Sequence, residues 1–176
     1  AYNGEIYNYQ KLNDYLKKNN IKVEGKSDSE TLFVLLKNFG IQKTLSLIDG
    51  MYAFSFYDKE NQKLYMARDK IGERFIYWGL NNKKLLFSSE IKTIIKSRFL
   101  KTSPNIEDIK DYLITSKIHG YKTFFNNVFE LEPGSFLTFD IKNKKYKIDK
   151  FWKIENTFVN KQISNPEKNL SKKLIQ

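Results

Sequence analysis

A change in hydrophobic period near residue 50 constrains the fold of this chain more than any other feature. Before it, apolar residues recur every three or four positions, as on one face of a helix. After it, Met51–Tyr57 is almost continuously apolar, which is typical of a β-strand covered on both faces. Helices followed by such strands predict an α+β fold, in which helical layers lie outside stacked antiparallel sheets.

The part before residue 50 predicts three helical segments and a short extended run at Ile21–Gly25. Ser27 and Glu30 have the spacing of a capping box, so a helix is expected to begin at Ser27. Gly40 is expected to end that helix in a left-handed conformation. The residues expected to face inward on the three segments are Leu12, Tyr15, Leu16, Leu32, Leu35, Leu36, Phe39, Ile41, Leu45 and Ile48.

The part after residue 50 predicts hairpins. Lys63–Arg68 is expected to pair with the apolar run, and Phe75–Gly79 with Lys84–Ser88, before three late strands that end near Trp152. Between these hairpins, Ser103-Pro104 predicts a helix start. The residues expected to point inward from that helix are Ile106, Ile109 and Leu113, and Arg68 with Asp69 is expected to form a structural ion pair.

Composition excludes several classes of function. The chain has no cysteine and one histidine, His119, so a disulfide framework, a thiolate metal site and a thiol nucleophile within these residues are excluded. His119 is expected to be a loop residue. The net charge of +11 comes from scattered lysines, and only three of the 31 basic residues are arginine. We therefore expect a solvated basic surface, with no nucleic-acid partner, no membrane span and no metal site.

The opening Asn3-Gly4-Glu5 is the stretch most able to carry chemistry, and it is expected to be a loop that leads into a helix. An Asn side-chain amide beside an accessible Gly N–H offers two donors to one point, as in an oxyanion hole for acyl transfer. Glu5 and Asp28 then both face a ligand ammonium. The alternative is that Asn3-Gly4 is only a turn and that Asp28 only favours the positive end of its helix.

A series of short blocks resembles the glutaminase domain of glutamine-hydrolysing asparagine synthetases. They occur in the family order over about residues 2–153. The blocks are Asn3–Tyr9 (N-G-E-I-Y-N-Y), Ser27–Thr31 (S-D-S-E-T), Asp49–Phe54 (D-G-M-Y-A-F), Ala67–Arg74 (A-R-D-K-I-G-E-R), Phe87–Lys92 (F-S-S-E-I-K) and Leu131–Gly134 (L-E-P-G).

The resemblance implies a four-layer αββα N-terminal-nucleophile hydrolase fold, truncated at its N-terminus, and hydrolysis of the glutamine side-chain amide by an N-terminal Cys. It also implies that Asn3 and Gly4 form the oxyanion hole and, with Glu5 and Asp28, bind glutamine. The parent enzyme would be cytoplasmic and would be able to form a homodimer. It would use ATP and Mg²⁺ in a C-terminal synthetase domain to amidate aspartate, and no cofactor is implied within these 176 residues.

The departures from the family set the expected boundaries. The family's nucleophile and its carboxylate-binding Arg lie upstream of the N-G-E block, so this chain alone is expected to be inactive. Residues 1–154 are expected to be the glutaminase domain without its first strands, 155–166 a linker, and 167–176 the start of the synthetase domain. Two alternatives remain: a related amidotransferase with a different carboxylate acceptor, and a non-catalytic basic binding or scaffold module.

Overall fold

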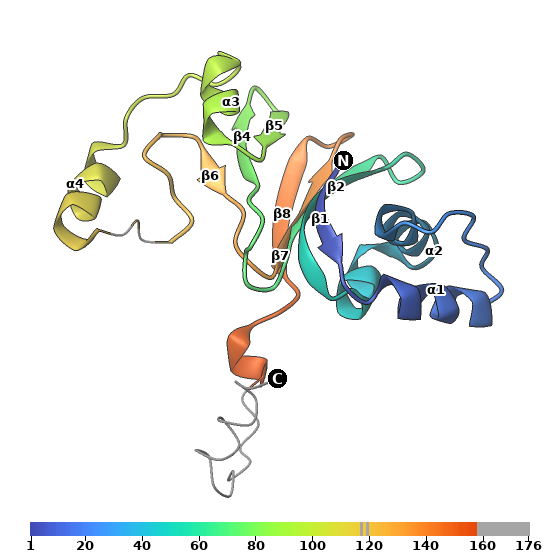
Figure 1. The fold of residues 1–176 in the computed structure, drawn as a ribbon. Coiled ribbons are helices and arrows are strands. Elements are labelled where there is room, and N and C mark those ends of the chain that lie inside the picture. Colours follow the sequence, from blue (N-terminus) through green and yellow to red (C-terminus); the bar gives the residue numbers. More distant parts are fainter. Residues whose placement is uncertain (117, 119, 158–176) are drawn as a thin grey trace, which may run out of the picture.

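The computed structural model describes residues 1–116, 118 and 120–157, and in them two antiparallel sheets lie between helices (Figure 1). The predictions for His119 and for residues 158–176 fall outside this described part. The elements in chain order are β1 (Tyr2–Ile6), α1 (Tyr9–Lys18), α2 (Asp28–Leu47), β2 (Gly50–Asp58), β3 (Lys63–Arg68), β4 (Tyr77–Asn81), β5 (Lys84–Ser88), α3 (Ile91–Lys96), α4 (Ile106–Thr115), β6 (Phe129–Glu130), β7 (Ser135–Asp140), β8 (Lys145–Lys150) and the 3₁₀ turn η1 (Ile154–Thr157).

Three apolar clusters hold the layers together. One sheet has the order β1-β2-β3-β7-β8 and the other the order β5-β4-β6. The largest cluster joins α1 and α2 to the outer face of the five-stranded sheet, through Leu16, Leu35 and Phe54 among others. The second lies between the sheets, where Met66 and Trp78 belong to opposite layers. The third packs Ile94 of α3 against the three-stranded sheet. The predicted α+β architecture with stacked antiparallel sheets is confirmed.

Helix α2 begins where the sequence predicts. Ser27 is the N-cap, and its side chain accepts a hydrogen bond from the Glu30 N–H at 3.2 Å. The Glu30 carboxylate does not complete the capping box, because it accepts instead from the Glu24 N–H at 2.9 Å. Gly40 has φ +71° and ψ 177°, so the predicted break divides α2 into two helical parts across a kink.

Two hairpin turns use the same chemistry. The β2–β3 turn has Asp58 and Asn61, and the β7–β8 turn has Asp140 and Asn143. In each turn the Asp carboxylate accepts from both the backbone N–H and the side-chain amide of the Asn, at 2.7–3.0 Å. These hydrogen bonds to the ionised form lower the pKa of both Asp carboxyls. The local turn therefore fixes the register of each hairpin.

Four local predictions were wrong. The helix expected at Ser103-Pro104 is capped by Asn105, whose side chain accepts from the Asp108 N–H at 3.3 Å. Its side chains Ile106 and Leu113 are 57% and 77% exposed rather than inward, because the buried residue of α4 is Asp108. The run at residues 21–25 pairs with no strand, and the strand expected from residue 75 begins at 77.

Arg68 and Asp69 are both buried, but the predicted ion pair between them was wrong. The Arg68 guanidinium pairs with Glu130 at 2.6 Å and donates to the carbonyls of Gly72, Arg74 and Leu131. The Asp69 carboxylate accepts five backbone N–H groups, from Tyr52, Ile71, Gly72, Glu73 and Arg74, at 2.6–3.4 Å. The cation of Arg68 binds carbonyl groups and the carboxylate of Asp69 binds N–H groups. Both side chains thus hold the turn after β3 in place.

We expect Asp69→Ala to destabilise the chain strongly. The substitution leaves five N–H groups without their acceptor, and each buried donor left unpaired costs about 1–3 kcal/mol. The free energy of unfolding in urea should fall by at least about 3 kcal/mol. The matched control is Asp14→Ala, whose ion pair with Lys17 is 71% exposed on both sides, and it should change stability by less than about 0.5 kcal/mol. Similar effects for the two variants would contradict this role of Asp69.

Candidate functional site

Among residues 1–116, 118 and 120–157, strand β1 forms one edge of the five-stranded sheet and pairs with β2 alone. The ladder is fixed at its two ends, since the Ser55 N–H donates to Ala1 O and the Tyr7 N–H donates to Asp49 O, both at 2.8 Å. Because bonding alternates along an antiparallel strand, odd-numbered residues of β1 bond to β2. The N–H groups of the even-numbered residues, including Gly4, therefore point outward at the free edge.

Gly4 is required by close backbone approach. Its φ is +153°, and a Cβ at this position would lie 2.1 Å from the Met51 carbonyl oxygen. Gly50 on β2 has the same relation to β1, with φ +157° and a Cβ position 2.1 Å from Glu5 O. A side chain at either position would collide with backbone, which cannot swing away as a side chain can. These two glycines therefore allow β1 and β2 to pair in the observed register.

Side chains of β1 alternate between two environments. Ile6 is fully buried against the helical layer, in the same cluster as Leu32 and Phe54. Asn3 and Glu5 have the opposite orientation and are exposed, opposite Ala53 and Met51 of β2. The structure thus places Asn3 and Glu5 together on the side that faces the second sheet, with the outward Gly4 N–H between them.

Asp28, the first residue of α2, reaches the same edge from the helical side. Its Oδ2 accepts from the Tyr2 hydroxyl at 2.5 Å and from the Ile6 N–H at 3.0 Å, and its Oδ1 accepts from the Ser29 N–H at 2.8 Å. Burial disfavours the charged form of Asp28, but these hydrogen bonds outweigh it and hold the pKa of the carboxyl below its usual value. Burial and the Asp28 hydrogen bond raise the pKa of Tyr2 well above its usual range.

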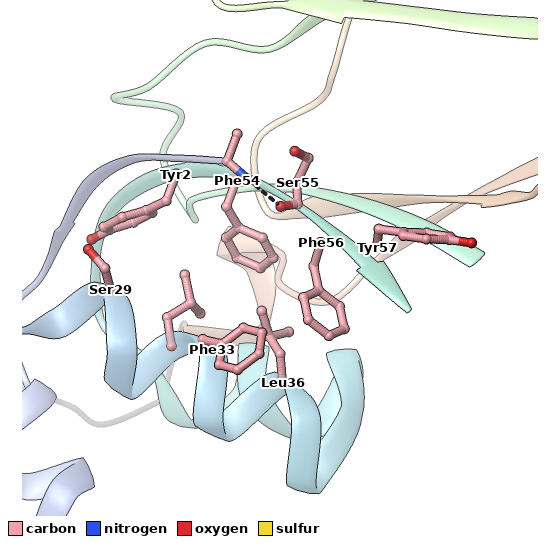
Figure 2. A pocket seen from close by; sticks show the side chains of 10 residues that line it. Tyr2, Ser29, Phe33, Leu36, Phe54, Ser55, Phe56 and Tyr57 are labelled. Carbon is pink, nitrogen blue, oxygen red and sulfur yellow. Dashed lines mark hydrogen bonds between the residues drawn. The ribbon is translucent and has the colours of Figure 1, made fainter. Parts of the chain in front are cut away.

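Two hollows of about 300 Å³ flank the beginning of β1. Figure 2 shows the first, of about 310 Å³, where Phe33 and Leu36 of α2 lie below Phe54 and Phe56 of β2. Its lining is mostly apolar, with Ser29 and Ser55 as polar members. The second, of about 300 Å³, is lined by Asn3 together with Ile76, Phe87, Ser88 and Ser89. Its volume is at the lower end of the roughly 300–1,000 Å³ of small-molecule sites, and it has polar groups to orient a ligand.

The arrangement can stabilise a developing negative charge on oxygen. It offers a backbone N–H at Gly4 and a side-chain amide at Asn3, which are the donor types of an oxyanion hole. Glu5 makes no side-chain hydrogen bond or ion pair with residues 1–116, 118 or 120–157, so its carboxylate is available to a cation. Within the same residues no three His, Cys, Asp or Glu side chains converge as metal ligands, and no helix is long and apolar enough to cross a membrane.

The structure brings all four predicted residues to one edge, but not as predicted. Asn3, Gly4 and Glu5 belong to a strand, so the expected loop was wrong. The alternative of a simple Asn-Gly turn is wrong for the same reason. Glu5 and Asp28 approach the edge from opposite sides of β1. Sequence reasoning missed Tyr2, and the only available signal was that Tyr2, Gly4 and Ile6 share a two-residue period, which indicates a strand.

Comparison with known proteins gives the family. The sequence model of the family "Glutamine amidotransferase domain" matches residues 1–152 of this chain. The chain therefore belongs to the glutamine amidotransferase domain family. Its relatives include glutamine-hydrolysing asparagine synthetase 2 of Bacillus subtilis, 27% identical over 159 residues that cover 88% of this chain and 21% of the relative. The human asparagine synthetase is 31% identical over 110 residues, which cover 59% of this chain and 19% of the relative.

A solved structure confirms the fold. Glutamine phosphoribosylpyrophosphate amidotransferase from B. subtilis superposes with a TM-score of 0.57 at 21% identity, over 86% of this chain and 28% of that chain. This likeness supports the predicted N-terminal-nucleophile hydrolase type of fold. The chain spans less than a third of the length of the relatives and of this structure that it matches.

We expect Gly4→Ala to be more destabilising than Gly40→Ala. Gly40 has a backbone conformation that favours glycine but no atom within 4 Å of its Cβ position, so the alanine costs only backbone strain of about 1–3 kcal/mol. Gly4→Ala adds a collision with Met51 O and should cost at least about 3 kcal/mol. Urea unfolding measures both. Equal losses would show that β1 can move away from β2 freely.

Proposed function

We propose that this chain is the glutaminase part of an ATP-dependent asparagine synthetase, which hydrolyses glutamine to supply ammonia for the amidation of aspartate. Membership of the glutamine amidotransferase domain family and the names of the relatives support the proposal. The observation that carries it is the pairing of an outward N–H at Gly4 with the exposed amide of Asn3 at the free edge of β1. A scaffold module would not need these donors at an open edge.

The proposed reaction needs a thiol from outside the 176 residues, because the chain has no cysteine. The thiolate attacks the side-chain carbonyl carbon of glutamine, and the carbonyl oxygen becomes an oxyanion that accepts from the Gly4 N–H and the Asn3 amide. The C–N bond then breaks, and protonation of the leaving nitrogen releases ammonia. Water hydrolyses the thioester to glutamate and regenerates the thiol.

Glu5 and Asp28 are proposed to hold the α-ammonium of glutamine. A single cation between two carboxylates offsets their mutual repulsion. Glu5 has no competing side-chain partner in the described residues, whereas Asp28 already binds two groups of β1 through Oδ2. Its Oδ1 accepts strongly only from Ser29, so this oxygen is the one proposed to reach the ligand.

The partners and boundaries follow from the same proposal. Residues 1–154 form the glutaminase domain, 155–166 a linker, and 167–176 the start of a synthetase domain. ATP and Mg²⁺ belong to that synthetase domain, and no residues of the described part are assigned to them. The whole enzyme is proposed to be cytoplasmic and to form a homodimer.

The chain of 176 residues alone should not hydrolyse glutamine. Purified chain incubated with glutamine should release ammonia at the rate of a protein-free blank, because the nucleophile is absent. The coding sequence upstream of Ala1 provides the complementary check, since the proposal requires a Cys directly after an initiator Met. Clear turnover by the chain alone, or a parent reading frame without that Cys, would overturn the mechanism.

Asn3→Ala and Glu5→Ala should affect different kinetic constants in the longer polypeptide that the proposal requires. Asn3→Ala removes an oxyanion donor, so kcat with glutamine should fall about 10²–10³-fold with a smaller change in KM. Glu5→Ala should mainly raise KM, because an ammonium contact is made in ground and transition states alike. Synthesis from added ammonia is the control and should survive both changes. If Asn3→Ala keeps kcat within about twofold of the parent, Asn3 is no oxyanion donor.

A further inference from the structure

One carboxylate oxygen holds both ends of the segment that contains Gly4. Asp28 Oδ2 accepts from the Tyr2 hydroxyl at 2.5 Å and from the Ile6 N–H at 3.0 Å. Figure 2 shows the Tyr2 ring extending from β1 toward the start of α2 at Ser29. Tyr2 lies two residues before Gly4 and Ile6 lies two residues after it, so a single acceptor ties the strand on both sides of this glycine.

Among the described residues, β1 has a neighbouring strand on one side only, and this tie acts on its other side. A strand with a neighbour on one side only has no second ladder to hold its outward N–H groups in place. Asn3 and Glu5 are exposed and are not buried on the side that faces the second sheet. On the helical side, Ile6 and Tyr2 are the residues that connect β1 to the core.

Asp28 is itself well anchored. It is the first residue of a helix whose second turn is packed in the core through Leu32 and Leu35. Its Oδ1 accepts from the Ser29 N–H, and a carboxylate at a helix N-terminus is favoured by the helix dipole. The position of Asp28 Oδ2 is therefore set by α2, and it transmits that position to β1.

We propose that Tyr2 is a positioning residue for the glutaminase reaction: through Asp28 Oδ2 it fixes the direction of the Gly4 N–H toward the oxyanion. This inference rests on the proposed function. It gives the two oxygens of Asp28 separate tasks, with Oδ2 holding β1 and Oδ1 reaching the ligand ammonium. It also gives Tyr2 a role that requires no contact between Tyr2 and glutamine.

The proposal predicts that two small substitutions in the longer polypeptide change different kinetic constants. Tyr2→Phe removes only the hydroxyl, so Asp28 keeps its charge and the Gly4 N–H loses its alignment. A misplacement of about 1 Å at a reacting group costs on the order of a hundredfold, so kcat should fall about 10- to 100-fold while KM stays within about threefold. Asp28→Asn keeps an oxygen acceptor for β1 but loses the negative charge, so KM should rise with kcat nearly retained.

The matched control is Tyr57→Phe. Tyr57 lines the first hollow, as Tyr2 does, and is 48% exposed. Its hydroxyl has no hydrogen-bond partner among the described residues. The kcat and KM of the Tyr57→Phe variant should equal those of the parent. A thermal melt of each variant shows whether it is folded. Amide hydrogen exchange in the 176-residue chain gives an independent readout, in which Tyr2→Phe should exchange faster at Ile6, whose N–H donates to Asp28 Oδ2.

The outcomes separate the two proposals. A parent polypeptide that does not hydrolyse glutamine refutes the proposed function and the positioning role with it. An active parent with Tyr2→Phe kcat within about twofold refutes the positioning role alone, even where exchange at Ile6 is faster, because the contact is then only structural. Equal losses of kcat in Tyr2→Phe and Tyr57→Phe would also refute it. A fall of kcat confined to Tyr2→Phe, with faster exchange at Ile6, supports it.

Discussion

The close backbone approach of β1 and β2 is the constraint on which the candidate site depends. Gly4 and Gly50 have no side chains at the two points where a Cβ would lie 2.1 Å from a carbonyl oxygen of the other strand. The resulting ladder fixes which N–H groups of β1 face β2 and which face outward. The orientation of Asn3 and Glu5 and the outward direction of the Gly4 N–H follow from that register. A shift of one residue would reverse every one of these orientations.

The parts of the fold that could be predicted from sequence are those where one strong local signal agrees with the tertiary contacts. Ser27 caps a helix in isolation and in the folded chain, and the apolar run Met51–Tyr57 fits a strand covered on both faces. Helix α4 was mispredicted because its apolar period was taken to mean burial. The helix instead buries Asp108, which binds Asn105 and Lys122, and leaves Leu113 exposed. Periodicity identifies a helix, but not the presence of a partner for its apolar face.

The segment of the candidate site was proposed from the sequence, but its geometry could not be predicted. The residue types of Asn3, Gly4 and Glu5 point to donors beside a carboxylate wherever the segment lies. The Asn-Gly pair is also a strong turn signal, and this signal outweighed the weaker two-residue period of Tyr2, Gly4 and Ile6. A predicted loop does not say in which direction each side chain points. The contact of Tyr2 with Asp28, 26 positions away, could therefore not be foreseen. Local patterns do not encode which helix end meets which strand edge.

A free strand edge is usually a liability, because its unpaired N–H groups invite other chains. Here some groups of the edge have structural partners and one N–H group is left open. The Ile6 N–H is satisfied by Asp28, and Tyr2 is tied to the same oxygen, so the ends of the segment are closed. The N–H between them belongs to Gly4, one of the two residues whose missing side chains let β1 approach β2 closely. The group that is left open at the edge is thus held in a fixed direction by its neighbours, and a donor whose direction is set before the reaction begins needs no reorganisation when charge develops on a ligand oxygen.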